Sequence, residues 1–301
     1  MSITPAELYA STDWTRDSFI HGVADEILLA NPAEGLVVWP HGDETLGAEV
    51  GYEMYKRRRD LLERVDYLCG DPAAAVQDPA VRDTSNFKKP VPGFEVQGTD
   101  MNRSYSPPDG PRSYEETRAA HVKSLIKLRG YKWILDIHTT KSTQDPCLIV
   151  SEYFLETPET RRIIAASAIG NIVVLPEWVP GNDNSGHMKP LVTLGLIGIE
   201  RRAVSVEYSR PMAAATGVAD TITTMDNLLA GKPASPDGIE RTLYTVTRTL
   251  PKNLDFSTIH NFQEHPDGFW PVLCSDLGDY LKDPSKDYSG FAATRGETIV
   301  L

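Results

Sequence analysis

The stretch Val37-Val38-Trp39-Pro40-His41-Gly42-Asp43-Glu44 joins an apolar run to a short polar turn. The apolar part, residues 36–39, lies between a glycine and a proline. Such a run is typical of a strand covered on both faces, as in an α/β sheet. His41 and Glu44 stand three positions apart in the turn, and an imidazole with a carboxylate suits zinc. Alone, the pair is a weak signal, because most such pairs are surface residues near a helix start.

Composition and charge narrow the class of protein. The chain has 301 residues and a net charge of −12, so it is long enough for a large and a small domain and offers no electrostatic support for a nucleic-acid partner. No apolar run approaches the ~20 residues that span a membrane, and no secretory signal precedes the first strand. Three scattered cysteines form neither a disulfide framework nor a thiolate metal site. These features predict a cytoplasmic protein that does not bind membranes, and they leave a homo-oligomer open.

Strands and helices are expected to alternate through residues 1–232. Apolar runs predict strands at residues 36–39, 65–69, 133–137, 148–151, 172–175 and 203–207. Helical spacing predicts helices at about residues 18–30, 46–63, 160–168 and 218–229, and a capping box at Ser113 starts another that ends at Gly130. The fold class is therefore α/β.

Two further polar residues stand near predicted strand ends. His138 follows the strand at residues 133–137, and Glu207 ends the strand at residues 203–207. Ligands in open α/β sheets bind beyond the carboxyl ends of strands, and His41 and His138 both fall at such ends. This shared placement strengthens the metal hypothesis. His41, Glu44 and His138 would form a His₂Glu set with an open position, which is a catalytic zinc pattern.

A long irregular segment at residues 71–112 contains Asp100-Met101-Asn102-Arg103. The simpler interpretation is a turn with an exposed ion pair, and the chemistry of the residues alone favours it. The alternative is a substrate clamp, in which the Arg103 guanidinium holds a carboxylate and Asn102 offers an amide donor. With Glu207 as a base, the parts needed for metal-assisted amide hydrolysis are present.

The character of the chain changes after residue 232. A segment rich in glycine and proline at residues 231–238 has the composition of a linker. Strands are predicted beyond it at residues 243–249, 269–273 and 298–301. We therefore expect a catalytic α/β domain at residues 1–232 and a small β-rich C-terminal domain at residues 233–301.

Four motifs together resemble the aspartoacylase/succinylglutamate desuccinylase family of the zinc carboxypeptidase-like superfamily. They are His41-Gly42-Asp43-Glu44, similar to H-G-x-E; Gly70-Asp71-Pro72-Ala73, similar to G-N-P-x with Asp for Asn; Asp100-Met101-Asn102-Arg103, similar to D-L-N-R; and Asp136-Ile137-His138-Thr139-Thr140, similar to D-L-H-x-T. The resemblance covers roughly residues 36–210. It implies a three-layer α/β/α domain with a mixed central sheet and a small, mainly β domain that caps the active site.

The resemblance also implies roles for individual residues. His41, Glu44 and His138 would bind one zinc ion per chain, and Glu207 would act as general base and acid. Arg103, with Asn102, would bind the α-carboxylate of the substrate. Asp136 and Asp100 would support the zinc ligands. A tyrosine of the C-terminal domain would reach the substrate, either Tyr280 or, as the alternate, Tyr288.

The chain departs from the family where substrates are recognised. The arginine shortly before D-L-N-R is replaced by the segment Phe94-Glu95-Val96-Gln97, and Glu207 is followed by Tyr208-Ser209-Arg210 in place of the family's x-G-x. A second family arginine, upstream of the catalytic Glu, is not clearly matched either, although Arg201, Arg202 and Arg210 lie near. Without the two arginines a site holds a second carboxylate less well, which counts against N-acetylaspartate and N-succinylglutamate. The predicted function is a zinc-dependent amidohydrolase acting on a small N-acyl amino acid. The alternatives are a metallocarboxypeptidase acting on peptides and a non-catalytic descendant that binds ligands.

Overall fold

The computed structural model describes residues 12–42, 44–75, 93–94, 100–105, 112–140, 144–180, 188–190, 196–275 and 288–301. The chain forms two compact units, Met1–His138 and Thr139–Leu301. Each unit has strands and helices of its own.

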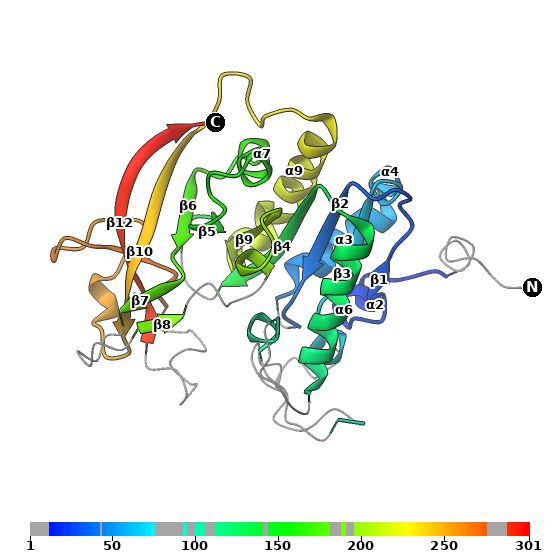
Figure 1. Cartoon of the computed structure of the whole chain (residues 1–301), viewed down its shortest axis with the longest axis horizontal. Helices are drawn as coiled ribbons and strands as arrows, with labels where there is room; N and C mark the ends of the chain where they lie inside the picture. Colours follow the sequence, from blue (N-terminus) through cyan, green and yellow to red (C-terminus); the bar gives the residue numbers. More distant parts are fainter. Residues whose placement is uncertain are drawn as a thin grey trace, which may run out of the picture. The chain divides into compact units, whose positions relative to one another are not determined.

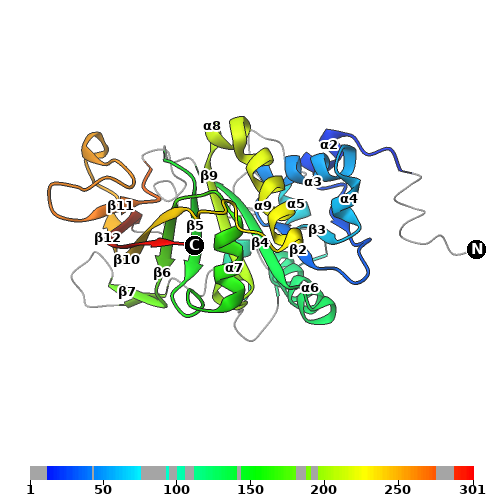
Figure 2. The same cartoon turned by 90° about the horizontal axis from the view of Figure 1, so that it is seen from above.

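The first unit is a small sheet with helices on both faces. Its strands are β1 (Glu26–Ile27), β2 (Gly35–Trp39), β3 (Val65–Cys69) and β4 (Trp133–Thr140), in the order β1-β3-β2-β4. β2 pairs in parallel with both β3 and β4, whereas β1 is antiparallel to β3. The helices are α2 (Arg16–Ile20), α3 (Leu46–Lys56), α4 (Arg59–Leu62), α5 (Pro72–Ala75) and α6 (Tyr114–Arg129), with a 3-10 turn η1 (Met101–Arg103). Figures 1 and 2 show α3 and α6 on opposite faces of this sheet.

Local sequence explains these elements. All five residues of β2 are buried, as a strand covered on both faces requires. The predicted capping box starts α6: the Ser113 hydroxyl accepts from the Glu116 amide, and the Glu116 carboxylate accepts from the Ser113 amide. Gly130 ends the helix with a φ of 63°, a backbone conformation that glycine adopts without strain. On α3, a Cβ at Gly47 would stand 2.4 Å from the Cβ of Trp39, so this glycine lets the helix lie close to β2.

The second unit contains a larger mixed sheet. Its strands are β5 (Cys147–Ser151), β6 (Asn171–Leu175), β9 (Ala203–Ser209), β10 (Glu240–Pro251), β11 (Trp270–Val272) and β12 (Tyr288–Val300), in the order β9-β5-β6-β10-β12-β11. β6 is parallel to β5 and β10, and the other pairs are antiparallel. β7 (Trp178–Pro180) and β8 (Met188–Pro190) form a separate pair. The helices are α7 (Pro158–Ala166), α8 (Arg210–Met212) and α9 (Val218–Ala230), with short turns η2 (Leu196–Gly198), η3 (Ala213–Gly217) and η4 (Phe256–Thr258).

The structure confirms the α/β class, because mixed strands alternate with helices in both units. Two predicted helices were too long. Residues 18–30 contain only the end of α2, since Gly22 takes a left-handed φ of 63° and residues 26–27 form β1. The helix predicted at residues 46–63 is divided into α3 and α4, because Arg58 leaves the helical region with a ψ of 51°.

The strands predicted after residue 232 overlap β10, β11 and β12. β10 pairs in parallel with β6 through residues 242–245, so these strands extend the sheet of the second unit. The predicted domain boundary between residues 232 and 233 stays a prediction.

Candidate metal centre

The turn after β2 presents two buried polar side chains. β2 ends at Trp39, and the Glu44 amide donates to the His41 carbonyl at 3.1 Å, which closes the turn before α3 begins. The side chains of His41 and Glu44 are nearly inaccessible, with residue exposures of 8% and 5%. A Cβ at Gly42 would stand 2.4 Å from the Ala74 carbonyl carbon, so the turn needs glycine here to lie against α5. The end of β2 and the contact with α5 together fix the position of the turn.

His138 reaches the same place from β4. The prediction put it just beyond the strand, whereas β4 continues through Thr140, since threonine favours extended backbone. Val38 of β2 pairs with Asp136 of β4, so the parallel register carries His138 level with the turn that follows β2. Neighbouring parallel strands therefore bring together residues that are almost a hundred positions apart.

The three predicted metal ligands form one cluster. The Glu44 carboxylate lies between the two imidazoles: Oε1 is 2.9 Å from His41 Nδ1, and Oε2 is 3.1 Å from His138 Nδ1. The ring centroids are 4.9 Å apart. One ligand atom from each residue lies within 4.8 Å of the others, so the cluster could hold a metal ion.

A second carboxylate contacts the outer nitrogen of each imidazole. His41 Nε2 lies 3.2 Å from Asp100 Oδ1, and His138 Nε2 lies 3.1 Å from Asp136 Oδ2. A metal-ligating histidine commonly donates its other N–H to a carboxylate, which fixes the tautomer and the ring orientation. Both Nδ1 atoms therefore face the shared carboxylate and are available as ligands. This donor set fits a small divalent cation such as zinc.

Electrostatics within the cluster favour charged groups. Burial lowers the pKa of His41, but the carboxylates of Glu44 and Asp100 outweigh it and raise the pKa to about 10. Burial likewise opposes charge on His138, yet Asp136 and Glu44 raise its pKa well above the usual value. Burial would raise the pKa of Glu44, and the two imidazoles lower it to about 2. A divalent cation could replace the imidazole protons and balance the same carboxylates.

Asp71, at the position where the resembled motif has Asn, is a buried carboxyl that interacts electrostatically with His41 of this cluster. Its Oδ1 accepts from the Ala74 amide at 2.9 Å, which caps α5 against the turn of Gly42. Burial raises its pKa to about 7, Glu115 adds to the rise, and the Ala74 amide opposes it. The sequence identified the exchange of Asn for Asp, but not this change in pKa.

The predicted substrate-binding residues are described only in part. Asn102 lies in η1, where its amide donates to Asp100 Oδ1 at 2.8 Å, so the turn that carries Asn102 also positions the carboxylate beside His41. Arg103 closes η1, and its side chain lies outside the described residues. Tyr280 lies outside them altogether, and Tyr288 begins β12 with a side chain that is not described. Their contacts with substrate stay predictions.

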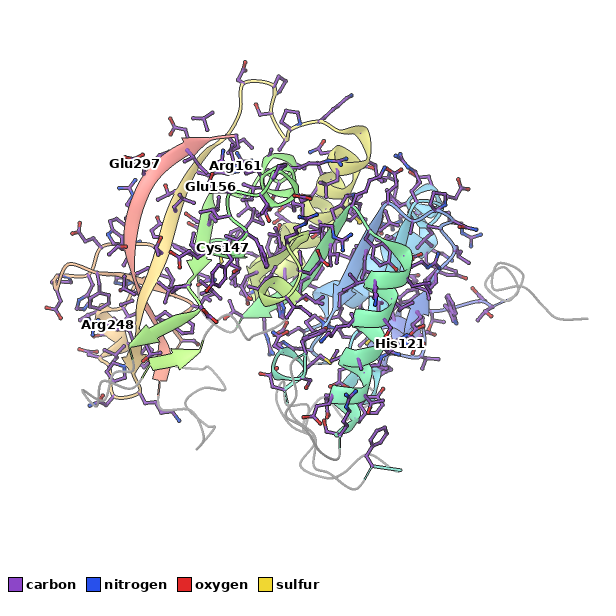
Figure 3. The ribbon with its side chains drawn as sticks, viewed as in Figure 1. His121, Cys147, Glu156, Arg161, Arg248 and Glu297 are labelled. Atoms are coloured by element: carbon purple, nitrogen blue, oxygen red, sulfur yellow. The ribbon has the colours of Figure 1, made fainter. Side chains whose placement is uncertain are left out.

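Glu207 lies in the second unit, inside β9 and not at its end, because the strand continues to Ser209. It is 9% exposed and stands directly opposite Cys147 of β5 in the antiparallel pair, so the two side chains share one face. Figure 3 labels Cys147, which lies on β5. Burial raises the pKa of the Cys147 thiol well above its usual value, and the Glu207 charge adds to the rise. The thiol beside Glu207 is therefore neutral, and the role of Glu207 as general base stays a prediction.

No family model matches the sequence, and no curated protein matches it. None of the helices in the described part of the chain is both long and apolar enough to cross a membrane. Solved structures do match at low sequence identity.

Murine aminoacylase 3 is 14% identical, covers 89% of this chain and 98% of its own, and has a TM-score of 0.58. The succinylglutamate desuccinylase of Vibrio parahaemolyticus is 12% identical, with coverage of 89% and 86% and a TM-score of 0.55. A succinylglutamate desuccinylase/aspartoacylase of Shewanella frigidimarina is 12% identical, with coverage of 90% and 91% and a TM-score of 0.50. The chain therefore has the fold of the aspartoacylase and succinylglutamate desuccinylase structures, as the four sequence motifs predicted.

Proposed function

We propose that this protein is a zinc-dependent amidohydrolase that cleaves an N-acyl amino acid into a carboxylate and a free amino acid. The observation that carries the proposal is the buried cluster of His41, Glu44 and His138, in which a further carboxylate contacts the outer nitrogen of each imidazole. The likeness of the fold to an aminoacylase and to desuccinylases supports a hydrolase.

One zinc ion per chain would be held by His41, Glu44 and His138. Three protein ligands leave a position open, which is the arrangement of catalytic sites. When bound, zinc supplies Lewis-acid polarisation of a carbonyl and lowers the pKa of water. Asp100 and Asp136 would keep each imidazole in the orientation that points Nδ1 at the ion.

Glu207 would move the proton of the reaction. Its carboxylate accepts a proton from the attacking water and then donates that proton to the departing amine, so it ends the cycle ionised, as it began. The neutral thiol of Cys147 adds no positive charge that would weaken this base. Arg103 and Asn102 would hold the α-carboxylate of the amino acid, because a guanidinium fork matches a carboxylate.

A screen for amine release tests the proposal. Zinc-loaded protein is incubated with N-acetyl, N-succinyl and N-formyl amino acids and, separately, with short peptides, and free amine is measured. We expect release from at least one N-acyl amino acid, its loss after zinc is removed, and its return when zinc is restored.

Two results would favour the alternatives. Release of C-terminal residues from peptides alone would identify a metallocarboxypeptidase. Full zinc occupancy without any amine release would identify a non-catalytic ligand-binding protein. Less than about one tightly held zinc per chain would contradict the zinc centre itself. The cytoplasmic location and a homo-oligomer stay predictions.

A further inference from the structure

A groove on the first unit lies along one face of α6 and has no role in the proposed reaction. It encloses a volume of about 290 Å³, near the lower end for small-molecule sites. Its lining residues come from the segment after η1, from Arg112, and from one face of α6, and they are Ser104, Tyr105, Arg112, Glu116, Ala120, Lys123, Ser124 and Lys127. None of the three metal-ligand residues lines it.

The groove concentrates positive charge on a protein whose net charge is −12. Among the described residues that line the groove, Arg112, Lys123 and Lys127 are cations and Glu116 carries the one carboxylate. One oxygen of this carboxylate already accepts from the Ser113 amide at 2.7 Å in the capping box of α6. Among the residues that the structure describes, no carboxylate forms an ion pair with Arg112 or Lys127. The charges of these two side chains are therefore available to a ligand.

Lys123 is fixed in place at the wall of the groove. Its ammonium donates to the Tyr105 carbonyl at 2.9 Å. A lysine ammonium has three donors, so two remain for another acceptor. Ser104 and Ser124 add neutral residues to the lining, and their hydroxyl groups already donate to the Asp100 and Ala120 carbonyls. A cation held by a backbone carbonyl loses less side-chain freedom when a ligand arrives than a freely rotating one does.

The rest of the lining is apolar. Ala120 and the methylene stems of the lysines offer hydrocarbon surface below the charged ends. The small volume and the overall negative charge of the protein disfavour a long polyanion. We propose that this groove binds a small organic dianion, whose charged oxygens contact basic side chains of the lining and whose apolar part rests on Ala120.

Titration calorimetry with two dianions tests the proposal. Phenyl phosphate and glutarate are titrated into the full chain at constant ionic strength, once with zinc and once after zinc is removed, and phenol serves as the uncharged comparison. We expect saturable binding of at least one dianion in both zinc states and none of phenol. Tighter binding of phenyl phosphate would identify a phosphate as the preferred group, and tighter binding of glutarate would identify a dicarboxylate.

Two variants locate the binding. Arg112→Gln and Lys127→Gln should each weaken binding about fivefold, the loss expected for one contact at the upper end for exposed ion pairs. Lys56→Gln is the matched control, because Lys56 is exposed on α3, outside the groove, and the change in net charge is the same. Amide NMR shifts should centre on Ser104, Ala120 and Ser124.

Three results would overturn the proposal. They are the absence of saturable binding, an equal effect of Lys56→Gln, and binding that requires zinc or shifts the signals around His41 and His138. Because the expected binding persists in zinc-free protein, failure of the amidohydrolase proposal leaves this test unaffected.

Discussion

The metal-ligand cluster of the first unit and the Glu207 strand of the second unit balance charge in different ways. In the cluster, Glu44 lies between two imidazoles, and each imidazole contacts a second carboxylate. On β9, Glu207 faces a thiol that burial keeps neutral. A network of opposite charges suits ion binding, whereas a carboxylate beside a neutral group suits proton transfer. Substitutions should therefore separate zinc binding from turnover.

The largest effects are expected from removing one carboxylate in each region. Glu44→Ala should lose both zinc and activity, because it deletes a ligand and leaves two buried imidazoles without their shared acceptor. Glu207→Ala should keep about one zinc per chain and lower kcat by roughly 10²–10⁴-fold, the usual contribution of a general acid–base group. Metal analysis and amine release, measured on the same preparations, give both values.

Glu297→Ala is the control for these variants. Glu297 is exposed on β12, where Figure 3 labels it, so its removal should change neither zinc content nor kcat. Substantial turnover by Glu207→Ala on a true substrate would remove Glu207 from the role of general base. Retention of tight zinc by Glu44→Ala would remove Glu44 from the ligand set.

A smaller effect is expected from the carboxylates that contact the outer imidazole nitrogens. Asp136→Asn should weaken zinc binding about 10–100-fold, because an amide holds the His138 ring less strongly than a carboxylate does. Asp100→Asn should have the weaker effect of the two, since its side chain is 14% exposed against 2% for Asp136 and water can replace part of its contact. Competition with a chelator of known zinc affinity measures both.

Equal losses of zinc affinity in Asp136→Asn and Asp100→Asn would show that side-chain exposure does not govern the strength of these two contacts. At saturating zinc, kcat should fall far less than in Glu207→Ala, because the ligands themselves remain. A loss of kcat as large as that of Glu207→Ala would assign Asp136 a direct part in the reaction.

Sequence and structure agree where local chemistry decides the outcome. β3 has the predicted bounds, and α6 begins at the predicted capping box, because both depend on neighbouring residues alone. The three residues of the predicted ligand set lie close together because their two motifs belong to the neighbouring parallel strands β2 and β4 and to the turn after β2. Glu207 and His138 were predicted at strand ends and lie inside strands, since β-branched residues and tyrosine after them continue the extended backbone.

The basic groove was not predicted. Its cations lie on one face of α6 and on a separate segment before it, and in sequence they are ordinary charges of a solvated helix. Only the folded chain places the Tyr105 carbonyl beside Lys123 and leaves Arg112 near the same wall. The raised pKa of Asp71 also depends on burial, which no short motif specifies.

The smallest effect, on stability alone, is expected at Asp71. Its pKa is raised from 3.8 to about 7 in the folded state, so the folded state favours the protonated carboxyl. The resulting stabilisation is fully present below pH 3.8 and is lost as the pH rises through about 7. Asp71→Asn keeps an oxygen for the Ala74 amide and cannot ionise, so it should raise the free energy of unfolding at pH 8 by roughly 1–3 kcal/mol.

Urea unfolding at several pH values, with zinc removed, measures the difference in the free energy of unfolding between the unchanged protein and Asp71→Asn. The contributions of His41 and Glu44 are common to these two proteins. The gain from Asp71→Asn should shrink as the pH falls toward 4, where Asp71 is protonated in the folded state. Asp237→Asn, an exposed site, should give no gain at any pH. A gain of the same size at pH 8 and at low pH would mean that packing, not ionisation, distinguishes Asn from Asp in the turn that supports the metal ligands.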